Sequence, residues 1–178
     1  MARARWVSAF FAAVALFMGG GTAAAQTVSS CPIPSGARWL CHEVVLSAPS
    51  DDVWTLWTTT DGLSSWVAPI AAIDPVAGGV FETSYDASAR LGDAGNIRNR
   101  VIAILPEHMI VLQIDQAPPG FPHAEAAREL ITQIDVERLS ASETRVRVVM
   151  SGFGEGAAFD ALLAFFERGN AFTLETLA

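Results

Sequence analysis

The feature that most constrains the fold is an amphipathic segment at the end of the chain, residues 157–177. At about 100° per residue, its large apolar side chains fall on one stripe and its charges lie opposite. The stripe holds Phe159, Leu162, Leu163, Phe166, Leu174 and Leu177, widened by Phe165 and Phe172, and faces away from Asp160, Glu167, Arg168 and Glu175. The pattern predicts one long helix that covers another apolar layer.

Strand candidates before this helix supply that layer. The first covers 42–46, and a run of others covers 80–86, 96–105, 109–115, 128–139 and 144–151, each bounded by turn residues. Between the first strand and the rest, Pro49, Asp51 and Asp52 begin a short helix, and 63–67 predicts a second. This order predicts an α+β fold in which an antiparallel sheet carries its helices on one face.

Residues 1–25 have the zones of a secretory signal peptide. Arg3 and Arg5 precede an uncharged apolar run over 6–18, and small residues lead to Gln26. The run is shorter than the roughly 20 residues that a membrane-spanning helix needs, so cleavage after Ala25 is favoured over an uncleaved anchor or a lipid attached at Cys31. We expect a periplasmic or secreted protein with no stable membrane insertion after cleavage.

The charge of the remaining chain is strongly acidic. The full sequence has a formal net charge of -8, and removal of Arg3 and Arg5 leaves 9 arginines against 19 acids, or -10. Nucleic acid is therefore an unfavourable partner. The chain has no lysine, which excludes Schiff-base chemistry on a lysine. A hydrophobic fraction of 51% is ample for a core.

Cys31 and Cys41 are the only cysteines. In an oxidising compartment such a pair favours a disulfide, which would hold an N-terminal extension, residues 26–41, against the first strand. Two free thiols, or a redox pair, remain as alternatives, although a redox motif normally has the tighter C-x-x-C spacing.

Several short motifs resemble one known family. Ala48-Pro49 precedes Val53-Trp54, the run 60–63 leads to 66–69, and Gly78-Gly79 opens the strand at Val80. The segments 96–107 and 144–146 and the last helix complete the pattern. In this order and spacing, residues 42–178 resemble the START-like (SRPBCC) helix-grip superfamily, in the branch called activator of heat-shock-protein ATPase homologue-like.

The resemblance implies a curved antiparallel sheet wrapped around the long C-terminal helix, with two short helices after the first strand. In relatives, the cavity between sheet and helix holds lipids, sterols, polyketides or other apolar molecules. It implies no single reaction, because the same fold serves carriers, cyclases and partner-binding domains. The chaperone-binding activity of cytosolic relatives is not carried over to an exported chain.

No motif for catalysis, metal or cofactor binding stands out. His42, His108 and His123 are scattered, and neither a G-x-S-x-G elbow nor a phosphate-binding loop is present. The glycines of 152–156 fit a turn that opens the last helix. We therefore assign no catalytic residue and expect no metal or cofactor.

Charged side chains on the strands have a simple structural interpretation. Glu82, Asp86, Asp135 and Glu137 are interpreted as a solvated face. Arg98, Arg100, Arg145 and Arg147 are spaced two apart on two strands, either as a stacked positive patch or in cross-strand pairs with those carboxylates, which we favour.

Aromatic and polar residues near the expected cavity are the ligand-binding candidates. Phe81, Thr83 and Tyr85 share one strand face, and Tyr85 brings the only phenolic hydroxyl. The loop 117–122, which contains Phe121, is expected to border the cavity mouth. The proposed ligand-binding set is Trp57, Trp66, Phe81, Tyr85, Thr132, Phe166 and Asn170.

Asn170 falls within the apolar stripe of the last helix, where a buried amide needs partners. Either Gly169-Asn170 breaks the helix, or Asn170 meets ligand, water or the Tyr85 hydroxyl in the cavity.

The favoured function is the binding of a small apolar or amphipathic molecule. The alternatives are a cyclase- or hydratase-type enzyme that uses Tyr85 or a nearby His or Arg, and an envelope protein-interaction module that uses a sheet edge or the loop around Phe121. The pattern does not indicate an oligomeric state.

Overall fold

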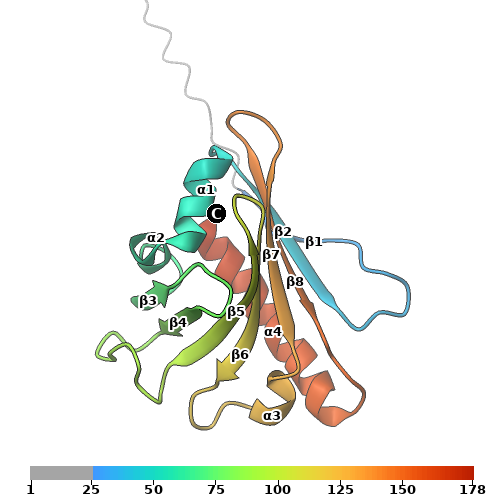
Figure 1. Cartoon of the computed structure of the whole chain (residues 1–178). Coiled ribbons are helices and arrows are strands. Elements are labelled where there is room, and N and C mark those ends of the chain that lie inside the picture. The colour runs from blue at the N-terminus through green and yellow to red at the C-terminus, as the bar shows by residue number, and fades with distance from the viewer. Residues whose placement is uncertain (1–25) are drawn as a thin grey trace, which may run out of the picture.

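A computed structural model describes residues 26–178, so the predicted signal peptide, residues 1–25, lies outside the described residues. The described chain forms one strongly curved sheet that wraps around a long C-terminal helix (Figure 1). That helix, α4, covers Ala157–Leu177, the range its apolar periodicity predicts. None of the helices in this part of the chain has the length and apolar character needed to span a membrane.

The sheet has eight strands in the order β1-β2-β8-β7-β6-β5-β4-β3, and all neighbours are antiparallel. The strands are β1 Ser29–Ser30, β2 Leu40–Leu46, β3 Ile70–Ile73, β4 Val80–Ser84, β5 Ile97–Leu105, β6 Met109–Gln116, β7 Ile131–Arg138 and β8 Thr144–Ser151. The predicted α+β helix-grip fold is confirmed.

The described residues also form three short helices, which lie near the two ends of α4. They are α1 Ser50–Thr58, α2 Thr60–Ser64 and α3 Ala124–Ala127. In Figure 1 the C-terminal end of α4 lies beside α1, and its N-terminal end lies beside α3. The cluster that contains Leu174 also contains Val53 and Trp57 of α1, which fixes that end of α4 over the core.

Two apolar clusters hold α4 against the concave face. The larger includes Val44, Val101, Ile134 and Val146 from the sheet, together with Leu174. The smaller lies near the start of α4 and includes Leu130, Met150, Phe153 and Leu162. Alternation explains the sheet contribution, because every second side chain of a strand points to the same face.

Three sequence predictions need correction. Strand β3 was missed because its four residues, Ile70–Ile73, are too few to show alternation and are paired only through β4. Helix α2 begins at Thr60 rather than at residue 63, because the Thr59 side chain accepts a hydrogen bond from the Gly62 backbone at 2.9 Å. The segment 128–130 precedes β7, after the unpredicted helix α3.

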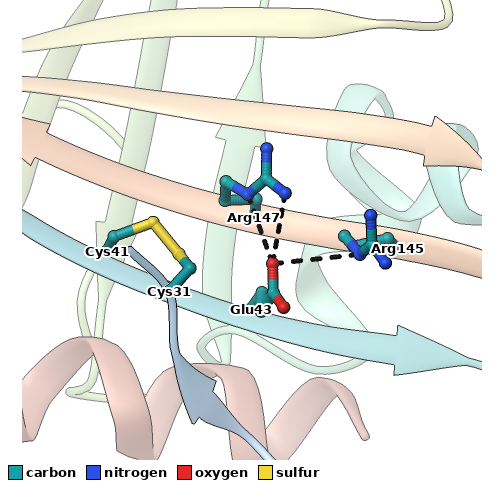
Figure 2. The surroundings of a disulfide bond; sticks show 5 residues. All are labelled: Cys31, Cys41, Glu43, Arg145 and Arg147. Carbon is teal, nitrogen blue, oxygen red and sulfur yellow. Dashed lines mark hydrogen bonds and ion pairs between the residues drawn. A yellow bond between two sulfur atoms is a disulfide. The ribbon is translucent and has the colours of Figure 1, made fainter. Parts of the chain in front are cut away.

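The Cys31–Cys41 disulfide is present, with Cα atoms 5.1 Å apart. It joins the residue after β1 to β2, and the Cys31 amide also donates to the Cys41 carbonyl at 3.0 Å. The bridge therefore holds the N-terminal extension along the edge of the sheet, as predicted. Figure 2 shows it on the same face of the sheet as Glu43, Arg145 and Arg147.

Charges on this outer face are paired across strands. Glu43 of β2 accepts from Arg147 at 3.2 Å and lies 3.8 Å from Arg145 (Figure 2), and Arg145 also pairs with Glu137 of β7 at 2.9 Å. Arg98 pairs with Asp115 at 3.1 Å. The alternative of one stacked arginine patch is wrong, because strands β7 and β6 separate β8 from β5.

Glu82 is a second correction to the charged set. It is 7% exposed rather than solvated, and its Oε1 accepts from the Asn96 side chain and the Gly92 amide, each at 2.6 Å. These contacts fasten the loop between β4 and β5 to the sheet, so Glu82 has a structural role.

Candidate functional site: a cavity between the sheet and helix α4

The concave face of the sheet is not filled completely by α4. A cavity of about 290 Å³ lies between them, at the lower end of the range for small-molecule sites. Its walls are mostly apolar and come from α1, the segment after α2, five strands and α4. The lining residues are Trp57, Val67, Phe81, Thr83, Tyr85, Ile97, Asn99, Leu112, Ile114, Phe121, Thr132, Ile134, Val148, Met150, Phe165, Phe166, Gly169, Asn170, Phe172, Thr173 and Leu174.

The sheet forms a continuous floor to the cavity. Leu112, Thr132 and Met150 are register partners across β6, β7 and β8, so their side chains stand in one row. Ile134 and Val148 form the next row of the same face. Strand alternation therefore places the cavity floor on the face that a sequence pattern would assign to the core.

Strand β5 adds Ile97 and Asn99 to the lining, which the sequence pattern could not decide. The register of β5 against β6 shifts between Arg98 and Asn99 and again between Val101 and Ala103. Such irregularities bend a strand and redirect its side chains. Simple alternation along 96–105 was therefore an insufficient guide to the residues that face the cavity.

Helix α4 approaches the cavity with Gly169, which sequence reasoning did not select as a site residue. A side chain at this position would meet no atom within 4 Å, so the missing Cβ leaves open space. A glycine inside a helix costs about 0.5–1 kcal/mol relative to alanine. The sequence signal that could have identified this position is a glycine on the apolar stripe of a long helix.

Asn170 lies next to this opening and lines the cavity. The proposed helix break is wrong, because α4 continues without interruption to Leu177. The Asn170 Nδ2 is buried and has no hydrogen-bond partner among residues 26–178, the Tyr85 hydroxyl included. Leaving such a group unpaired costs about 1–3 kcal/mol. The amide is therefore the polar group of the α4 wall that lacks a protein partner.

Aromatic side chains surround the mouth of the cavity. Phe121, from the proline-rich loop predicted to border the mouth, packs with ring centroids 5.4 Å from Phe165 and 6.2 Å from Phe166. Tyr85 is 63% exposed and Phe172 67% exposed. Tyr85 thus belongs to the rim of the mouth rather than to an inner wall.

Six of the predicted ligand-binding residues line the cavity: Trp57, Phe81, Tyr85, Thr132, Phe166 and Asn170. Trp66 does not. Its ring packs edge-on against Trp57, with centroids 4.7 Å apart, and its Nε1 donates to the Leu56 carbonyl at 3.2 Å. Trp66 therefore supports a wall residue from behind.

The electrostatic character of the cavity is neutral. Among residues 26–178, the lining includes no Asp, Glu, His or Arg, and Tyr85 at the rim is its one titratable residue. His42 lies outside the lining; its burial lowers the imidazole pKa, and the nearby Glu167 opposes that shift. Nowhere in residues 26–178 do three or more metal-ligating side chains converge.

The curved sheet, the enclosed helix and the cavity between them define a protein of the helix-grip, START-like class. The family model described as "Activator of Hsp90 ATPase homolog 1-like protein" matches residues 47–178, and the chain belongs to this family. The family suggested by the sequence motifs is thereby confirmed. No curated protein sequence matches the chain.

Solved structures support the fold. The chain is similar to the Aha1 dimer from Colwellia psychrerythraea, with 19% identity, a TM-score of 0.61 and coverage of 78% of this chain and 92% of that one. A protein from Mesorhizobium loti has 18% identity, a TM-score of 0.61 and coverage of 79% and 93%. An Hsp90 activator from Plasmodium falciparum has 14% identity, a TM-score of 0.50 and coverage of 78% and 90%. At these identities the likeness concerns the fold.

Proposed function

We propose that this protein binds a small apolar or amphipathic molecule in the cavity between the sheet and α4, without covalent chemistry. The observation that carries the proposal is the hollow itself. Protein interiors are normally packed as densely as organic crystals, yet here about 290 Å³ stays open between apolar walls. Packing for stability alone would favour a larger side chain than glycine at position 169, where open space is available.

The lining favours binding over catalysis. A general base must lie within hydrogen-bond reach of the proton it removes, and the cavity walls present neutral side chains with Tyr85 at the rim. Neither histidine nor arginine reaches the lining, so the cyclase- or hydratase-type alternative has no acid–base pair to work with.

The proposal also places the protein in the bacterial envelope or outside the cell. The charge and apolar zones of residues 1–25 support this location, and the Cys31–Cys41 disulfide is a bond that persists in oxidising compartments. Intact mass of the exported form tests it: a chain beginning at Gln26 agrees with the proposal, and one that retains residues 1–25 contradicts it.

The family description favours a second function, the stimulation of a chaperone ATPase. The Plasmodium falciparum relative is described as an Hsp90 activator, and its fold is shared. This function needs contact with a chaperone rather than an occupied cavity. Adding the described domain to a purified Hsp90 and measuring ATP hydrolysis separates the two: stimulation without any cavity ligand would favour the second function.

Extraction of the purified native protein with organic solvent, followed by mass spectrometry, tests the ligand proposal directly. We expect a copurifying apolar molecule, or, after its removal, saturable binding of the uncharged dye Nile red. Denatured protein serves as the control for nonspecific association. The proposal fails if no molecule copurifies and the dye shows no saturable binding.

A further inference from the structure

The cavity has a chemical selectivity that its shape alone does not reveal. Its polar lining groups are those of Thr83, Tyr85, Asn99, Thr132, Asn170 and Thr173 and the indole N–H of Trp57, and none of them belongs to an Asp, Glu, His or Arg side chain. A charged ligand group that entered would lose water without gaining a counter-charge, and this is strongly unfavourable. Arg145 and Arg147 pair with Glu43 on the outer face of the sheet and supply no counter-charge to the cavity.

Asn170 gives the selectivity a positive component. Its amide lies in the cavity wall, and its Nδ2 has no hydrogen-bond partner within residues 26–178. The Trp57 indole N–H of the lining is also unpaired in this range, but it can only donate. A 180° rotation of an asparagine amide exchanges donor and acceptor, so a hydroxyl group, which both donates and accepts, matches either orientation. The neighbouring Gly169 leaves open space beside the amide. Thr173 is less available, because its hydroxyl donates to the Gly169 carbonyl at 2.9 Å.

We infer, on the basis of the proposed binding function, that the cavity selects an uncharged apolar molecule that carries a hydroxyl group, with Asn170 as the residue that pairs with this hydroxyl. Carboxylates such as fatty acids and cationic amphiphiles are excluded by the neutral walls. The apolar body of the ligand lies on the floor formed by Leu112, Ile134 and Val148.

Three probes that share one ring system and differ in a single substituent test the inference: naphthalene, 2-naphthol and 2-naphthoate. The affinity of each is measured by displacement of Nile red at pH 7. We expect 2-naphthol to bind about three- to tenfold more tightly than naphthalene, because one hydrogen bond is gained. We expect 2-naphthoate to bind at least about tenfold more weakly than 2-naphthol, because its charge is unpaired.

The variant Asn170→Leu tests whether Asn170 is the residue that pairs with the hydroxyl group of the ligand. In this variant the preference for 2-naphthol over naphthalene should disappear. Thr176→Val is the matched control, because the exposed Thr176 hydroxyl also lies on α4 but outside the cavity lining, and this variant should keep the preference within about twofold.

The outcomes separate this inference from the proposed function. Binding of 2-naphthoate as tight as that of 2-naphthol overturns the selectivity and leaves ligand binding intact. A preference that survives Asn170→Leu, or that is lost in Thr176→Val, does the same. Failure of Nile red and all three probes to bind the wild-type protein overturns ligand binding itself. The wild-type ranking holds as a test even if Asn170→Leu does not fold.

Discussion

The two faces of the same sheet differ in how their side chains are paired and packed, and strand β8 contributes to both faces. Its outward side chains, Arg145 and Arg147, meet Glu43 and Glu137 in ion pairs (Figure 2). Its inward side chains, Val148 and Met150, border a space that none of the described residues fills. On the outer face charge is matched by charge, whereas on the inner side the buried amide nitrogen of Asn170 has no partner in the described part of the chain.

This difference indicates what each face contributes. The outer face stabilises the fold through the disulfide, through strand pairing and, to a small extent, through ion pairs, since exposed pairs contribute about 0–1 kcal/mol. The inner side gives up packing density and leaves two donors of the cavity lining, Asn170 Nδ2 and Trp57 Nε1, without partners in residues 26–178. Regions that sacrifice local stability are often those that bind or react, which agrees with the proposal that the inner face binds a ligand.

The largest effect is expected where the inner face is filled rather than hollow. Leu162 is fully buried in the smaller cluster and does not line the cavity, so Leu162→Ala should lower the free energy of unfolding by about 3–5 kcal/mol. Leu112 borders the cavity, and Leu112→Ala should cost less, about 2–3 kcal/mol. Urea unfolding measures both. A larger loss for Leu112→Ala would contradict the division into filled and hollow parts.

Loss of the disulfide is expected to have the next largest effect. Replacing Cys31 and Cys41 together by serine should lower stability by about 2–3 kcal/mol, because the unfolded chain is no longer restrained. Nile red affinity should not change, since neither cysteine lines the cavity. Unfolding and dye titration of the same samples check this. A parallel fall in affinity would show that the two faces are coupled.

His42 should make stability depend on pH. Burial lowers the pKa of its imidazole in the folded state, so the unfolded state binds the proton first as the pH falls. Its contribution is complete above about pH 6.5, the unfolded value, and is lost below it, by at most about 1.4 kcal/mol per pH unit. His42→Leu should remove this dependence between pH 7.5 and 5.5. The free energy of unfolding is measured against pH by thermal or urea unfolding. An equal dependence on pH in the wild-type protein and in His42→Leu would contradict the prediction.

The smallest effect is expected on the outer face. Glu43→Gln removes the carboxylate shared by Arg145 and Arg147, yet it should cost less than about 1 kcal/mol, because the groups are partly exposed. The cost should shrink further in 1 M salt, where screening is strong. A loss above 2 kcal/mol that persists in salt would show that these charges carry more of the stability than the comparison assigns to them.

Periodicity predicted the regular elements well. Strand β8 covers Thr144–Ser151 and α4 covers Ala157–Leu177, as predicted, because both segments show sustained apolar alternation or an apolar stripe. The family resemblance and its fold followed from short motifs in order. Strand β3 could not be predicted in this way, because its pairing with β4 depends on chain segments that meet only after folding.

The site was predicted in part, and the failures have physical causes. Trp66 was assigned to the wall, but its indole packs behind Trp57. Tyr85 has the alternation of a wall residue, yet it follows the end of β4 and lies at the rim. Asn170 and its position on the stripe were visible in the sequence. The open space beside Gly169 was not, because it depends on the distance between α4 and the sheet.

One substitution tests directly whether the hollow inner face binds a ligand. Gly169→Leu places a side chain in the open space beside α4. It also removes a glycine from the middle of a helix, so it should raise the free energy of unfolding by about 0.5–1 kcal/mol. The same side chain should weaken Nile red binding at least about tenfold by filling the cavity. Ala164→Leu, on the exposed side of α4, is the matched control and should leave binding unchanged. Undiminished binding to a folded Gly169→Leu protein would contradict the central claim that the cavity is the binding site.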